Sequence, residues 1–251
     1  MEKQIKETKH IIAYLDFLGV KKRICSGDTE FINQLKFIYH KAKQNCQKVN
    51  SCVDNSKLAP IKQQIFSDNI VFAQEIISKD NVYQVFNFIL FVSAYLHQAL
   101  LDGFLVRGGI TIGDLYIDNT FVSGKALVKA YQLESQIAIY PRVVVDFDVF
   151  GILSTLDDMI MKNFSLPVGD DLIYCIDGFR VIFKPPGMRI ALEKIRKAIL
   201  EICKYEKNFK IVQKHLWVIT QFNDFCTAQK QEKYQINVLE DYASVEQLAS
   251  I

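Results

Sequence analysis

An apolar run from His10 to Leu15 stops abruptly at Asp16-Phe17-Leu18-Gly19. The run is rich in residues that favour strands, and the glycine permits a sharp exit of the chain. We therefore predict a first strand with an aspartate at its end. Asp28 follows as a candidate cap of a helix whose apolar residues recur every three or four positions as far as Val49. This spacing keeps one face of the helix buried, and we expect a polar loop from Asn50 to Lys57 to end the helix.

Turn residues divide the next hundred positions into further strands and helices. Ser67-Asp68-Asn69 separates two extended runs, which predicts a hairpin over Leu58–Ile77 with Asp68 at its tip. The glycine-rich segment that begins at Phe104 predicts two strands joined across Asp114–Thr120. The other expected elements are a helix capped by Asp80 and stopped by Gly103, a helix over Ala126–Gln136, a strand over Arg142–Asp146 and an irregular segment to Asn163.

The last third of the chain has a different pattern. Asp171–Phe183 predicts a hairpin that turns at Asp177-Gly178. Two helices follow, with apolar stripes over Met188–Ile202 and Val212–Phe222. The chain contains no repeat and no flexible linker, so we expect these helices to pack on the sheet as part of the same body.

Composition excludes several classes of protein. The chain has 251 residues, half of them apolar, and a formal net charge of +2, which gives no electrostatic footprint for nucleic acid or an anionic membrane. No apolar stretch reaches the ~20 residues of a membrane span, and the charged amino terminus does not resemble a signal peptide, so we expect a cytoplasmic protein. The six cysteines are scattered, which argues against a zinc site or a disulfide framework.

The usual motifs of catalysis are also missing. There is no phosphate-binding loop, no dinucleotide fingerprint and no G-x-S-x-G elbow, and the four histidines are far apart. What remains is a pair of aspartates, Asp16 at a strand end and Asp68 at a hairpin tip. Two such carboxylates can hold two hard cations, which can bind a triphosphate. Aspartates at these positions are also common turn formers, and that alternative stays open.

Several phrases strengthen the interpretation of a metal site. They are IIAYLDFLGVK (Ile11–Lys21), IFSDNIVFA (Ile65–Ala73), VRGGITIGDLY (Val106–Tyr116), FVSGKALVKAYQLES (Phe121–Ser135) and YPRVVVD (Tyr140–Asp146). In this order they resemble the catalytic domain of class III nucleotide cyclases, and most closely the antiphage pyrimidine cyclases of bacterial Pycsar systems. The resemblance implies an α+β fold with a mostly antiparallel sheet flanked by helices. It also places a catalytic domain at residues 9–150, followed by a hairpin and two-helix extension at residues 151–251.

The resemblance assigns roles to the residues of the first two phrases. Asp16 and Asp68 match the two metal-binding aspartates, and the carbonyl of Phe17 would be a further ligand of two Mn²⁺ or Mg²⁺ ions. The amides from Leu18 to Val20 would meet the triphosphate, where Gly19 allows close approach of the backbone. In the implied reaction the ribose 3′ oxygen attacks the α-phosphorus and pyrophosphate leaves.

Departures from purine cyclases indicate a different base. Gln64 and Phe121 occupy the positions of the lysine and aspartate that select adenine, so UTP or CTP is the expected substrate. Val128 and Gln132 occupy the positions of an asparagine and an arginine that orient the ribose and stabilise the transition state. An active enzyme then needs other groups for these tasks, since loss of one such donor can cost roughly 100-fold to 1000-fold in rate.

Basic residues nearby are the candidate replacements. They are Arg107, Lys125, Lys129 and Arg142, and Tyr131 is a further candidate for the pocket. Lys125 and Lys129 lie four residues apart on one helix face, which fits phosphate binding and a solvated basic face equally well.

The resemblance also implies partners. Family members form homodimers with active sites at the interface, and a separate effector that binds the cyclic nucleotide is expected. The leading hypothesis is a pyrimidine cyclase that makes cyclic UMP or cyclic CMP as an antiphage signal. The alternatives are a degenerate cyclase-like module that binds a nucleotide without turnover, and a structural dimerisation domain.

Overall fold

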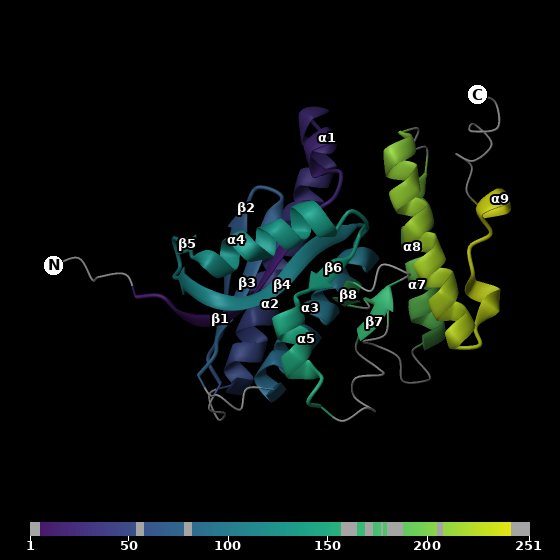
Figure 1. Cartoon of the computed structure of the whole chain (residues 1–251). Helices are drawn as coiled ribbons and strands as arrows, with labels where there is room; N and C mark the ends of the chain where they lie inside the picture. Colours follow the sequence, from purple (N-terminus) through teal and green to yellow (C-terminus); the bar gives the residue numbers. More distant parts are fainter. Residues whose placement is uncertain are drawn as a thin grey trace.

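A computed structural model describes residues 6–53, 58–77, 82–156, 165–168, 173–176, 178–179, 188–204 and 208–241 (Figure 1). Its centre is a single twisted sheet with helices around it. The strands lie side by side in the order β2 (Ile61–Phe66), β3 (Asn69–Glu75), β1 (Thr8–Phe17), β4 (Val106–Ile117), β6 (Val143–Val145), β8 (Ile173–Ile176) and β7 (Ser165–Val168), and the short β5 (Val122–Ser123) pairs with the end of β4.

The sheet is mostly antiparallel. Only β4 and β6 run parallel among the described strand pairs. β1 is central, and in its register Asp16 lies opposite Asn69 of β3 and Arg107 of β4. The predicted α+β class with a mostly antiparallel sheet flanked by helices is therefore confirmed.

Alternate residues of β1 face two different layers, as the period of a strand requires. Ile11, Leu15 and Phe17 are buried in the main core beneath α2 (Thr29–Val53) and α3 (Val82–Leu101). Ile12 and the partly buried Tyr14 belong to a smaller apolar cluster beneath α4 (Lys125–Gln132). Asp16 has the same parity as Tyr14, so its carboxylate lies on the α4 side of the sheet.

Helix α3 is the one described helix that is long and apolar enough to cross a membrane. Its apolar window is 61% buried inside the protein, and Val85, Phe88 and Val92 are fully buried in the main core. Burial of this kind is typical of the core helix of a soluble protein.

The last helices form a second core with the end of α3 and the loop that precedes β4. α7 (Met188–Cys203) and α8 (Phe209–Ala228) pack on each other, and their buried residues meet Leu100 and Leu105. Leu18, two residues after Asp16, packs against the same cluster. A short turn, η4 (Glu232–Tyr234), and α9 (Val238–Asp241) follow. α7 and α8 thus contact the end of α3 and the loop before β4.

Local predictions had mixed outcomes. The cap at Asp28 is confirmed, since its Oδ1 accepts from the amide of Phe31 at 2.9 Å. The predicted loop from Asn50 is wrong, because α2 continues to Val53, where its last turns lie against β2. The boundary at Asp114 is also wrong, because β4 continues to Ile117 and turns at Asp118. Asp80 lies outside the described residues.

The region after β6 departs most from expectation. The segment predicted to be irregular contains α5 (Phe147–Leu153), which buries Val149 and Leu153. β7, which lies beyond that segment, pairs antiparallel with β8. Arg180 to Phe183, the second arm of the predicted hairpin, lies outside the described residues.

Candidate active site

The two aspartates singled out by sequence lie at one edge of the sheet. Asp16 ends β1, and Asp68 lies in the tight turn between β2 and β3, where Ser67 has a φ of 53°. The amide of Phe17 donates to the carbonyl of Asp68 at 3.0 Å, which ties the strand end to the turn. Asn69 donates its side-chain amide to Oδ1 of Asp68 at 3.0 Å. The structure thus brings Asp16, Phe17 and Asp68 together.

Arg107 joins this pair to a third carboxylate. Its Nε donates to Oδ2 of Asp16 at 2.9 Å and lies 2.6 Å from Oε1 of Glu134. Glu134 is 2% exposed, and burial raises its pKa to about 7 although Arg107 opposes the shift. Burial also raises the pKa of Asp16, which Arg107 opposes and the charge of Asp68 reinforces. The site therefore concentrates negative charge around one guanidinium.

Glycines make this arrangement possible. Glu134 lies in a π-helical turn, Leu133–Ile137, that continues α4, and such turns are frequent at functional sites. A Cβ on Gly109 of β4 would collide with the carbonyl of Ala130 and with Leu133. A Cβ on Gly108 would collide with the backbone of Tyr14. Only glycines at both positions let α4 and β1 approach β4 closely enough to place Glu134 beside Arg107.

The charge of a lysine from the carboxy-terminal extension also acts on the site. Lys214 of α8 is half-buried and interacts electrostatically with Asp16, Glu134 and Arg107. Burial lowers its pKa, and Arg107 adds to that effect while the two carboxylates oppose it. Tyr14 borders the same group, and burial followed by the charges of Glu134 and Asp16 raises its pKa to about 12. The C-terminal helices are therefore part of the electrostatic environment of the aspartates.

The other basic candidates have different partners. Lys129 pairs with Asp146 and lies 3.2 Å from Asp148, and Thr111 donates to the same Asp146 oxygen at 2.6 Å. Lys125, the first residue of α4, is exposed. Arg142 is buried and donates to the carbonyl of Ile137 at 3.3 Å.

The candidate base-reading residues meet at the turn after β4. Gln64 donates to the carbonyl of Asp118 at 2.6 Å, and the amide of Phe121 donates to the carboxylate of Asp118 at 2.9 Å. Phe121 is 50% exposed, and its ring lies 6.3 Å from that of Tyr116. Tyr131 is also exposed and makes an edge contact with Tyr14 at 5.7 Å.

One amide of the loop expected to bind phosphates is already hydrogen-bonded within the protein. The amide of Leu18 donates to the carbonyl of Leu105 at 2.9 Å. Gly19 has a φ of 81° and precedes the short helix α1 (Val20–Cys25). A phosphate at this loop would therefore have to use the amides that follow Leu18.

Two site residues were missed by sequence reasoning. Ala126, Ala130 and Glu134 recur every four residues, and this spacing was a signal that Glu134 lies on the buried face of its helix. Lys214 gives no such signal, because only the packing of α8 brings it near Asp16.

The arrangement suits oxygen-ligated cations and the binding of a polyanion. Carboxylate oxygens are the ligands that Mg²⁺ and Mn²⁺ prefer, and Asp16 and Asp68 supply them from two neighbouring segments. Among the described residues no group of three or more histidine, cysteine, aspartate or glutamate side chains is arranged to hold a metal ion, so such a site would need backbone, water or substrate oxygens as well. Neither protein-family models nor curated proteins give a match to this chain.

Proposed function

We propose that the chain is a metal-dependent nucleotide cyclase that converts UTP, or CTP, into cyclic UMP, or cyclic CMP, and pyrophosphate. The observation that carries the proposal is the placement of Asp16 and Asp68 at one edge of the sheet, held by the bond from Phe17 to Asp68. The resemblance of the surrounding phrases to class III cyclases supplies the reaction class. The proposed fold within the α+β class is accordingly that of the cyclase catalytic domain.

The aspartates would hold two divalent cations, with the carbonyl of Phe17 as a further ligand. When bound, these cations would lower the pKa of the attacking 3′ hydroxyl and neutralise charge on the departing pyrophosphate. Arg107 already binds Oδ2 of Asp16, so a cation must use the other oxygen of this carboxylate or replace the guanidinium. The ion pair keeps the apoprotein from burying uncompensated negative charge.

The protein's own cations would bind the triphosphate. Arg107 pairs with Asp16, and Lys214 interacts electrostatically with the same carboxylate, so we assign to these two cations the role of the arginine that this chain lacks at Gln132. Glu134 would position Arg107 by holding its guanidinium. Lys129 is instead engaged by Asp146 and Asp148.

A homodimer with shared sites accounts for an exposed apolar surface beside α4. Phe121, Val128 and Tyr131 are each at least half exposed. Exposed large apolar side chains that gather in one region commonly mark an interface. In a symmetric pair these residues, with Gln64 and Lys125, would face the nucleotide held by the partner's aspartates. The proposed setting is the cytoplasm, with the product acting as an antiphage messenger on a separate effector.

The test is product identification. Purified protein is incubated separately with ATP, GTP, CTP and UTP in the presence of Mn²⁺ or Mg²⁺, and products are identified by mass spectrometry. We expect a cyclic pyrimidine nucleotide and pyrophosphate, and loss of both in Asp16→Asn and Asp68→Asn. Glu201→Gln, which changes an exposed carboxylate on α7, is the control. Absence of any cyclic product at high protein concentration would overturn the proposal.

A second candidate is a module that binds a nucleotide without turnover. It is favoured by the ion pair of Arg107 with Asp16 and by Val128 and Gln132 at positions where purine cyclases carry catalytic residues. This candidate predicts that UTP or CTP raises the melting temperature of the protein although no product forms. Thermal shift and product assays on one preparation separate the two functions.

A further inference from the structure

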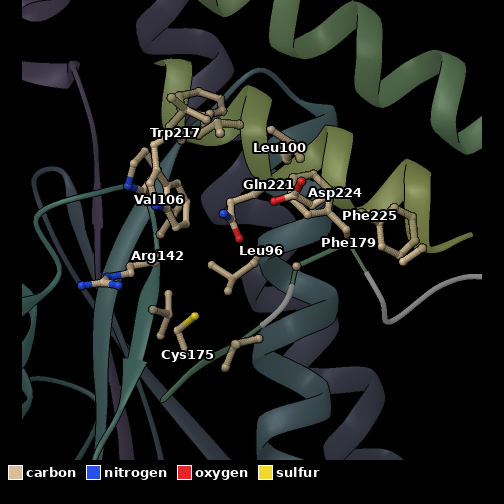
Figure 2. Close-up of a pocket in the computed structure, with 18 residues that line it drawn as sticks. Leu96, Leu100, Val106, Arg142, Cys175, Phe179, Trp217, Gln221, Asp224 and Phe225 are labelled. Atoms are coloured by element: carbon tan, nitrogen blue, oxygen red, sulfur yellow. The ribbon is translucent and has the colours of Figure 1, made fainter. Parts of the chain in front are cut away.

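A cavity of about 190 Å³ lies between the sheet and α8, apart from the candidate active site (Figure 2). Its walls are mainly apolar side chains from α3, β4, β8 and α8, among them Leu96, Val106, Cys175, Trp217 and Phe225. An apolar cavity of about 150 Å³ is large enough to bind benzene. The space therefore suits one aromatic ring or a body of similar size.

The polar groups of the cavity lie mainly on one helix. Gln221 and Asp224 are three residues apart on α8, so they share a face. Figure 2 shows the Gln221 amide directed into the cavity and the Asp224 carboxylate beside it. Arg142 also lines the cavity, but it donates to the carbonyl of Ile137, and its guanidinium points away from the centre in Figure 2. The charge that α8 offers to an occupant is therefore negative.

Aromatic side chains line the same cavity. Phe179 lies 6.0 Å from Phe225 between ring centroids, and both line the cavity with Trp217. Aromatic faces together with a carboxylate form a favourable environment for an organic ammonium group, because ring faces and carboxylates both attract cations. An anionic occupant would meet repulsion from Asp224.

We propose that this cavity is a binding site for a small organic amine, with an apolar body of aromatic size between the sheet and α8 and its ammonium group beside Asp224. The amide of Gln221 is a second polar contact for the same end of the ligand. Binding here does not depend on the proposed cyclase activity, because neither aspartate of that site lines the cavity.

The fluorescence of a tryptophan in the cavity can report on ligand binding. Trp217 is the only tryptophan in the sequence and lines the cavity, so selective excitation of its indole reports on occupancy. The probes are phenethylamine, ethylbenzene and 3-phenylpropionate, which share a phenyl body and differ in the charge of the head group. We expect saturable change in emission and a rise in melting temperature with phenethylamine, and binding at least about threefold weaker with the other two probes.

Two variants test the placement. Asp224→Asn keeps the shape of an exposed side chain and should weaken phenethylamine binding roughly threefold to fivefold without changing the affinity for ethylbenzene. Val218→Phe adds volume at a buried wall and should abolish binding of all three probes. Glu201→Gln, an exposed acid on α7 that does not line the cavity, is the control.

The outcomes are decisive even if Val218→Phe does not fold, because the charge test uses a surface position. Lack of saturable binding of phenethylamine would overturn the proposal. Equal binding of 3-phenylpropionate, or unchanged phenethylamine affinity in Asp224→Asn, would overturn the assignment of an amine. A selective loss in Asp224→Asn with normal binding in Glu201→Gln supports it.

Discussion

Replacing Glu134 by glutamine tests the buried carboxylate at the centre of the candidate site. The pKa of Glu134 is raised from 4.5 to about 7, so the folded protein holds a proton that the unfolded chain has released between these pH values. Folding stability should therefore be full below about pH 4.5 and fall as the pH rises to about 7. A difference of about 2.5 pH units corresponds to about 3 kcal/mol, since each unit is worth about 1.4 kcal/mol.

Glutamine keeps the shape of the side chain and an oxygen beside Arg107, but it does not titrate. We expect the free energy of unfolding of Glu134→Gln, relative to that of the wild type, to rise by up to about 3 kcal/mol between about pH 5 and about pH 8. The measurement is urea unfolding at several pH values with linear extrapolation. Glu201→Gln on the exposed face of α7 is the control and should parallel the wild type.

A difference in the free energy of unfolding between Glu134→Gln and wild type that is the same at every pH would refute the raised pKa of Glu134. So would a gain in the stability of the wild type relative to the variant as the pH rises. The latter result would mean that Arg107 outweighs burial and holds the pKa of Glu134 below its ordinary value. Either result would remove the argument that Glu134 is held partly protonated beside Asp16.

Three further substitutions follow from the structure. Lys214→Met should lower the cyclase rate at least about tenfold, because it removes a cation that interacts with Asp16. The control is Lys197→Met, which changes an exposed lysine on α7 and should leave the rate unchanged. An equal loss of rate in both variants would refute the role of Lys214. Gly109→Ala should lower the free energy of unfolding by about 1–3 kcal/mol, because the added Cβ collides with Ala130 and Leu133. Gly151→Ala is the control, since its Cβ meets nothing within 4 Å and the change should be neutral or stabilising. Urea unfolding of both variants measures the two free energies, and an equal effect would contradict the prediction. Asp28→Ala should cost about 1 kcal/mol in the same assay by removing the cap of α2, and an unchanged midpoint would contradict that assignment.

The elements that the sequence predicted well have strong local signals. β1, the β2–β3 hairpin and α3 each carry a regular apolar pattern bounded by turn or cap residues, and all three are present. The prediction that Asp16 and Asp68 lie close together required β1 and β3 to be neighbouring strands. They are neighbours, and Asp16 lies opposite Asn69, the residue after Asp68. Boundaries such as the end of β4 were missed because strand pairing, here with β5 in a hairpin, extends a strand past turn-forming residues.

Other features have no local signal. α5 follows Asp146 in a segment that is too short to show a helical period, and burial of Val149 against the main core decides its conformation. The environment of Arg107 depends on three segments far apart in the chain, which carry Asp16, Glu134 and Lys214. A single sequence does not show which of many charged residues will meet across such distances.

Strand β4 links the two sites of the molecule through consecutive residues. Val106 lines the cavity beneath α8, Arg107 binds Asp16 and Glu134, and Gly108 and Gly109 allow β1 and α4 to pack closely. The loop before the strand also contacts both sites. Leu105 lines the cavity, and its carbonyl accepts a hydrogen bond from the amide of Leu18. A protein interior transmits displacement through such close packing. The carboxy-terminal helices therefore rest on the same strand that holds the guanidinium of the candidate active site, and both sites depend on its position.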